Sequence, residues 1–274
     1  MAFTVHAVMP GVWHIVDCMG VCMTLLEGEN AAMLVDTGYG IEDVADFMRH
    51  MTDLPLTVFL THNHHDHAMG ARCFPETYML EADMADWRMF TDDKMRRRVL
   101  TQAIGKNLPV DEKTFLAGEI PLPKVMKPGV IDLGGLTAEI IEAPGHTPGS
   151  AVVYVPERKL LLSGDDWNPC TWLFFPQALG LREYRSNMRG IQQLPFEKVL
   201  CPHREALYDR WMFDDFFNAL TDGNLRAAEP VNIAPYEQID TCCRMIKCSY
   251  STGQNQDCKE KKCHETGFHP HSGG

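Results

Sequence analysis

THNHHDHAMGA, residues 61–71, is the stretch from which the fold and the chemistry of this chain are best approached. It directly follows LTVFL, an apolar run typical of a buried strand. In an extended segment His62 and His64 project to the same side, so two imidazoles can meet one metal ion. A turn into a helix near Asp66 can direct Asp66 and His67 toward a second ion. The pattern therefore predicts a metal site at the end of a strand.

Three further apolar segments run into residue types that bind metals. LTAEIIEAPG precedes His146, KLLLSG precedes Asp165, and KVLCP precedes His203. Ligands collect at strand ends in layered α/β proteins, because the sheet fixes the start of each loop while the loop can point inward. A solvated histidine-rich turn would explain the first cluster, but not these additional residues. Asp166 competes with Asp165 for the same role.

The order of the predicted elements indicates a layered α/β protein with one main domain. Strands are expected within residues 1–35, then a helix at 41–51 and a strand at 56–60. The later predicted segments are a helical insertion at 83–106, a loop or cap up to 135, strands at LTAEIIEA, AVVYV, KLLLSGD and EKVLCPH, and helices at 183–193 and 204–220. We expect a domain over residues 1–228, with the insertion at about 83–135. An extension at 229–274 would hold an edge strand at RMIKCSYS and a flexible tail containing Cys and His.

Composition limits the partners. A net charge of −12 argues against nucleic-acid binding, which draws affinity from clustered Lys and Arg. Apolar runs are too short for a membrane-spanning helix, and the N-terminus lacks the pattern of a secretory leader. We therefore expect a cytoplasmic protein with reduced cysteines and a small-molecule substrate, and homo-oligomers are compatible with the sequence. The Cys and His of the tail lack the paired spacing of structural zinc sites.

The motifs together resemble the metallo-β-lactamase superfamily over about residues 8–220. They are VDTG at 35–38, the 61–71 stretch, APGHTPGS at 143–150, LLSGDD at 161–166 and CPH at 201–203. The resemblance implies a four-layer αββα sandwich, with two mixed sheets face to face and the metals at one edge. It also implies two metal sites and their support: His62, His64 and His146 at one ion, Asp66, His67 and His203 at the other, Asp165 as the bridge, and Asp36 behind the ligands. Asp165 is preferred over Asp166 because it directly follows Gly164.

These ligands favour hydrolysis. A divalent ion lowers the pKa of bound water from about 15.7 to about 7, so a hydroxide nucleophile exists at neutral pH. Two divalent ions carry four positive charges, of which Asp66, Asp165 and one hydroxide remove three, leaving a positive field for an oxyanion. Asp66 or a metal-bound water would relay a proton to the leaving group. Zinc suits the imidazole and carboxylate ligands, and iron and manganese also accept them.

The fold alone does not choose the substrate. We rank carboxylic esters, thioesters and lactones first, and phosphoric or sulfuric esters next. The alternatives are a β-lactamase, an iron-dependent oxygen-using enzyme of the same fold, and a metal-binding sensor without turnover. Several aromatic residues either line a substrate wall or pack in the core: Trp167, Trp172, Phe174, Phe175 and Tyr184. Trp87, Met89 and Phe90 of the insertion could close over the site, whereas His6, His14 and His50 are assigned no role and His65 is expected to face away.

Overall fold

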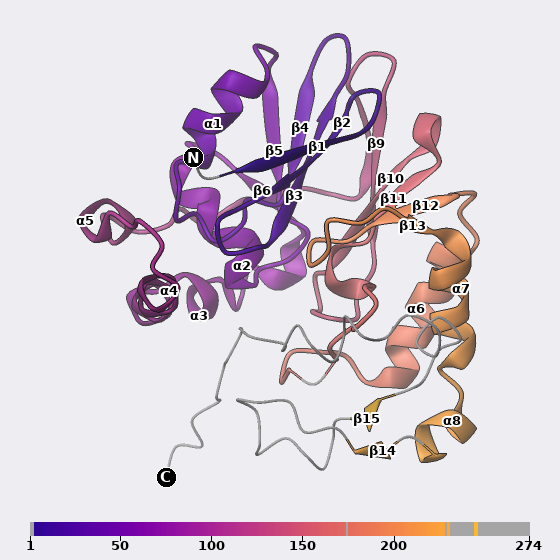
Figure 1. Ribbon diagram of the computed structural model, residues 1–274. Coiled ribbons are helices and arrows are strands. Elements are labelled where there is room, and N and C mark those ends of the chain that lie inside the picture. The colour runs from indigo at the N-terminus through magenta and orange to yellow at the C-terminus, as the bar shows by residue number, and fades with distance from the viewer. Residues whose placement is uncertain (1–2, 174, 228, 231–243, 246–274) are drawn as a thin grey trace.

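The computed structural model describes residues 3–173, 175–227, 229–230 and 244–245. Most of its strands form two mixed sheets that face each other (Figure 1). The first has the order β1-β2-β3-β4-β5-β6-β7: β1 (Thr4–Met9), β2 (Val12–Val16), β3 (Cys22–Glu27), β4 (Ala32–Val35), β5 (Leu56–Phe59), β6 (Tyr78–Met79) and β7 (Lys124–Val125). Strands β1 to β4 pair antiparallel, and β4 to β7 pair parallel.

The second sheet has the order β13-β12-β11-β10-β9-β8. Its strands are β8 (Gly129–Asp132), β9 (Thr137–Glu142), β10 (Ala151–Val155), β11 (Leu160–Leu162), β12 (Lys198–Leu200) and β13 (Tyr208–Asp209). Only the β11–β12 pair among them is parallel. A separate short pair joins β14 (Glu229–Pro230) to β15 (Arg244–Met245).

Helices cover the outer faces of both sheets. Helix α1 (Val44–Met51) packs on the first sheet, and α6 (Leu181–Gln192) and α7 (Arg210–Ala219) pack on the second. Between the sheets lies an apolar layer that includes Val35, Phe59 and Leu162. Strands β4 and β10 are buried along their whole length because they have apolar neighbours on both faces. The predicted four-layer αββα sandwich is confirmed.

The insertion forms a separate helical group next to the first sheet. It consists of η2 (Glu81–Asp83), α3 (Trp87–Thr91), α4 (Asp93–Gly105) and α5 (Glu112–Phe115). The remaining short helices are α2 (His65–Ala68), η1 (Met69–Cys73), η3 (Pro156–Arg158), η4 (Gly164–Asp166) and α8 (Asp222–Ala227). An apolar cluster containing Trp87, Phe90 and Val99 joins the group to the chain around Met69. The helical insertion therefore shares its apolar core with the loops next to the first sheet.

Two sequence predictions were wrong in detail. The segment predicted as a loop or cap up to residue 135 contains the edge strands β7 and β8, which are short and mostly exposed and so lack an apolar repeat. The helix predicted from residue 204 begins at Arg210, because Tyr208 and Asp209 pair with β12. Most of the predicted edge strand at RMIKCSYS, and the whole Cys- and His-containing tail, lie outside the described residues. The domain boundary at residue 228 stays a prediction.

Within the described part of the chain, the structure contains no helix both long enough and apolar enough to cross a bilayer. The cytoplasmic location stays a prediction, and so does the possibility that the protein forms homo-oligomers.

Candidate metal centre

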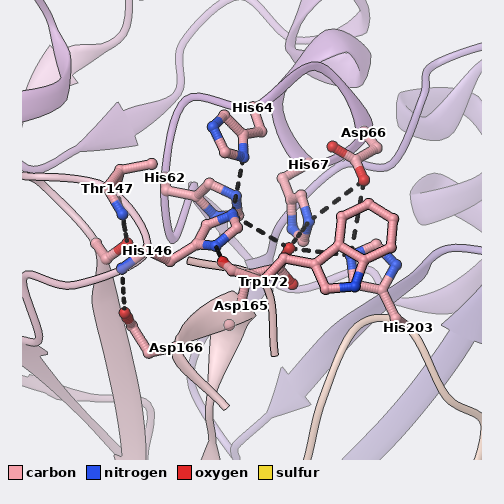
Figure 2. A network of polar contacts seen from close by, with 12 residues as sticks. His62, His64, Asp66, His67, His146, Thr147, Asp165, Asp166, Trp172 and His203 are labelled. Carbon is pink, nitrogen blue, oxygen red and sulfur yellow. Dashed lines mark hydrogen bonds and ion pairs between the residues drawn. The ribbon is translucent and has the colours of Figure 1, made fainter. Parts of the chain in front are cut away.

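Four loops bring the seven predicted ligands to one edge of the two sheets (Figure 2). The loop after β5 and helix α2 supply four of them, and the β9–β10 loop, η4 and the loop after β12 supply one each. Their nitrogen and oxygen atoms form three groups, each within 4.8 Å: His62, His64 and His146; His62, His67 and Asp165; and Asp66, His67 and His203. The structure thus brings together all the residues that the sequence motifs implied.

The first group consists of three buried imidazoles. Burial lowers the pKa of His62, His64 and His146, so these rings favour the neutral form that can bind a metal. Nδ1 of His146 donates to the carbonyl oxygen of Trp172 at 2.7 Å, which leaves its Nε2 a lone pair. That Nε2 lies 2.9 Å from Nδ1 of His64. The neutral rings of His64 and His146 therefore direct one nitrogen each toward the same possible metal position.

Asp165 lies between this first ligand group and the group of Asp66, His67 and His203, called the second ligand group below. Its Oδ2 is 3.5 Å from Nε2 of His146, 3.5 Å from Nε2 of His67 and 3.0 Å from Nε2 of His203. Although burial alone would raise the pKa of Asp165, His203 and His67 lower it well below its ordinary value. The carboxylate therefore stays ionised in contact with histidines of both groups.

The second group is more negative than the first. Oδ2 of Asp66 lies 3.8 Å from Nε2 of His67 and 3.7 Å from Nε2 of His203. Burial opposes protonation of His67, yet Asp165, Asp66 and Asp36 raise its pKa well above the ordinary value. The same carboxylates that attract a proton to His67 would attract a divalent cation in its place.

Several ligand atoms are buried without a hydrogen-bond partner. They include Nε2 of His62, Nε2 of His67 and Oδ1 of Asp165. A buried polar atom left unpaired costs free energy, and these atoms point into one cluster. Imidazole nitrogens and carboxylate oxygens without thiolate are a ligand set suited to zinc and related divalent metals. The residues present therefore fit a metal centre.

Asp36, for which the resemblance implied a supporting role, hydrogen-bonds to Thr61 and His67 behind the ligand atoms. Its Oδ1 accepts the Thr61 backbone N–H at 2.7 Å, and its Oδ2 accepts Nδ1–H of His67 at 2.9 Å. The Thr61 hydroxyl lies within 3.0 Å of Asp36 and of Nδ1 of His62. One carboxylate thus orients ligands of both groups. Asp36 has a left-handed backbone with φ of 66°, a conformation that Asp and Asn adopt more readily than other residues with a side chain.

Asp83 is a buried anchor that the sequence did not reveal. It accepts hydrogen bonds from the Thr147 hydroxyl at 2.7 Å, the Gly149 N–H at 2.6 Å and the Asn63 N–H at 3.2 Å. These donors belong to the two loops that carry His62, His64 and His146. A Cβ at Gly149 would meet Asp83 at 2.7 Å or less, so glycine is required there. An isolated aspartate far away in the chain carries no local signal of this contact.

Replacing Asp83 with alanine is expected to lower the free energy of unfolding by about 3 kcal/mol, because three buried donors lose their acceptor. Urea unfolding of the metal-free protein measures this, with Asp53→Ala as the control because Asp53 is exposed. Equal stability of the two variants would show that the anchor contributes nothing.

The proposed substrate wall needs correction at two positions. Trp167 and Tyr184 are fully buried in the cluster on the outer face of the second sheet, and the Tyr184 hydroxyl donates to the Asp166 carbonyl oxygen. They therefore pack in the core. Trp172 lies at the ligand cluster, whereas Phe174 falls outside the described residues. His65 faces Tyr39 with ring centroids 5.5 Å apart.

Comparison with known proteins agrees with this geometry. The family model described as the metallo-beta-lactamase superfamily matches residues 16–203, so the chain belongs to that superfamily. The resemblance in the motifs is thereby confirmed. Over 202 residues the chain is 26% identical to acyl-coenzyme A thioesterase MBLAC2 of Gallus gallus, a match that covers 65% of this chain and 70% of that one.

Solved structures show the same fold. A metallo-β-lactamase from Pontibacter korlensis matches with a TM-score of 0.57 and 17% identity, over 79% of this chain and 97% of that one. A metallo-β-lactamase family protein from Thermus thermophilus matches with a TM-score of 0.57 and 20% identity, over 81% and 82%. The metallo-β-lactamase FIM-1 from Pseudomonas aeruginosa, in its mono-zinc form, matches with a TM-score of 0.56 and 17% identity, over 78% and 92%.

Proposed function

We propose that this chain is a metal-dependent hydrolase of ester-like bonds, with thioesters as the first substrate class and zinc as the metal in both groups. The observation that carries the proposal is Asp165, an ionised carboxylate in contact with histidines of both ligand groups. The similarity of the chain to an acyl-coenzyme A thioesterase of Gallus gallus supports the choice of a thioester.

We assign the substrate carbonyl and the attacking water to different ligand groups, because the charges of the two groups differ. The group of His62, His64 and His146 is neutral, so it would favour an electron-rich carbonyl oxygen of the substrate. The group that includes Asp66 is anionic, so a metal ion there would hold the attacking water rather than the substrate carbonyl. Divalent ions held there would supply a hydroxide at neutral pH and a positive field for the oxyanion.

Asp66 is the candidate to carry the proton. Burial alone would raise its pKa, but His67, His65 and His203 lower it, so the carboxylate is ionised and can accept a proton. One oxygen faces His67 and His203, and the other lies 3.8 Å from Nδ1 of His65. An ionised relay suits a leaving group that needs little help from a proton. A thiol, with a pKa of about 8.5, is such a group.

The test combines metal analysis with a panel of chromogenic thioester, lactone, β-lactam, phosphodiester and sulfate ester substrates. We expect about two zinc ions per chain, highest kcat/KM on the thioester, loss of turnover after chelation and recovery with zinc. His50→Ala serves as the control, because His50 is exposed on α1. Tight zinc without turnover on any substrate would instead favour a metal-binding sensor, and a preference for the β-lactam would favour that activity.

A further inference from the structure

Three aromatic residues lie next to the ligand cluster. The ring centroids of Phe90 and Phe175 lie 4.6 Å and 5.1 Å from that of His64. Phe175 is also 5.6 Å from His146, and Trp172 is 6.2 Å from Phe175. Phe90 and Phe175 therefore lie beside the neutral group of ligands, and Trp172 continues from Phe175. Figure 2 shows the Trp172 indole in front of the cluster, near His203 in this view.

These rings come from two segments that contact each other. Phe90 belongs to α3 of the insertion, whereas Trp172 and Phe175 follow η4. Nε2 of Gln177 donates to Sδ of Met89 at 2.9 Å, which ties the second segment to α3. Phe90 is buried at 3% exposure in the cluster that joins the insertion to the chain around Met69, so its position is fixed, whereas Phe175 and Trp172 are only half-buried. Phe175 and Trp172 can thus present apolar surface to a ligand, and Phe90 fixes the ring of His64 beside them.

The ligand group that contains Asp66 is more polar. Nδ1 of His65 lies 3.8 Å from Oδ1 of Asp66, and Arg204 donates to the carbonyl oxygen of the ligand residue His203 at 2.9 Å. A substrate with one apolar and one polar end would therefore bind in a single orientation. Its carbonyl would lie at the neutral ligand group, next to the aromatic rings.

We propose that Phe175 and Trp172, supported by the buried Phe90, form an acyl-binding wall, which selects substrates with an apolar acyl chain of several carbons. This inference rests on the proposed hydrolysis of thioesters and names the part of the substrate that the rings contact. Each methylene that leaves water against such a wall favours binding of the reacting complex by about fourfold. The preference grows with chain length until the rings are covered.

The test uses acetyl, butanoyl and octanoyl thioesters of one common thiol with the zinc-loaded full chain. In the wild type, kcat/KM is expected to rise with acyl length. Phe175→Ala is expected to lose about tenfold on the octanoyl thioester and less than about twofold on the acetyl thioester, and Phe90→Leu is expected to change the preference in the same direction. Phe47→Ala is the matched control, because Phe47 is a half-buried phenylalanine on α1.

A binding measurement separates this wall from the proposed reaction. Calorimetry on the zinc-loaded protein should give tighter binding of decanoate than of acetate, and Phe175→Ala should reduce that difference. If the wild type hydrolysed no thioester but kept this preference, the proposed function would fail and the wall would stand. An equal loss by Phe175→Ala on the acetyl and octanoyl thioesters, with its decanoate preference intact, would overturn the wall.

Discussion

Asp165→Asn is expected to lower kcat/KM by about a thousandfold and to reduce the zinc content of the purified protein. An amide has one acceptor oxygen and a donor NH2 group, whereas Asp165 Oδ2 lies within 3.5 Å of ring nitrogens of His146, His67 and His203. The variant therefore loses the negative charge that both ligand groups share. Elemental analysis and steady-state kinetics on the preferred substrate measure the two losses.

Asp166→Asn is the matched control. Burial raises the pKa of Asp166 well above its ordinary value, so this carboxyl favours the neutral form, which asparagine imitates. Its Oδ1 accepts the His146 N–H at 3.0 Å, a bond that the amide oxygen can keep. We expect Asp166→Asn to retain zinc and to lose no more than about tenfold in kcat/KM. The reverse pattern, with activity kept in Asp165→Asn and lost in Asp166→Asn, would assign the bridge to Asp166.

The strand ends were predictable because their signals are local. LTVFL, KLLLSG and KVLCP each show a buried strand and its following ligand type within a few residues, so His62, Asp165 and His203 could be proposed without a structure. Edge strands β7 and β8 could not be predicted in this way, because exposed strands of two and four residues have no apolar repeat.

Contacts between distant residues explain the remaining differences. Asp83 and Thr147 are 64 positions apart, and nothing near either residue indicates that they meet. Trp167 directly follows the ligand loop, which suggested a place in the substrate wall, yet the turn at η4 sends the ring into the core beside Phe213. Phe90, from the insertion, reaches His64 only through the packing of α3. Local patterns thus identified the ligands, while tertiary packing decided which neighbours support and surround them.

Asp36→Asn is expected to weaken zinc binding by about 10- to 100-fold, although Asp36 is not proposed as a ligand. Its two oxygens accept different donors, the Thr61 N–H and Nδ1–H of His67. An asparagine can satisfy only one of them, because its NH2 group then faces the other donor. If the NH2 faces His67, the proton of that ring moves to Nε2 and occupies the nitrogen that would bind the metal.

Asparagine is the suitable replacement because it adds no backbone strain at position 36. Asp36 has a φ of 66°, and asparagine tolerates the left-handed region as well as aspartate does, whereas alanine would add strain. Zinc affinity is measured by competition with a chromogenic chelator, with Asp53→Asn as the control because Asp53 is exposed. The expected result is a weaker zinc affinity for Asp36→Asn alone, together with a proportionate loss of turnover that excess zinc partly restores. Unchanged affinity in Asp36→Asn would mean that packing around Thr61 and His67 holds the ligands without this carboxylate.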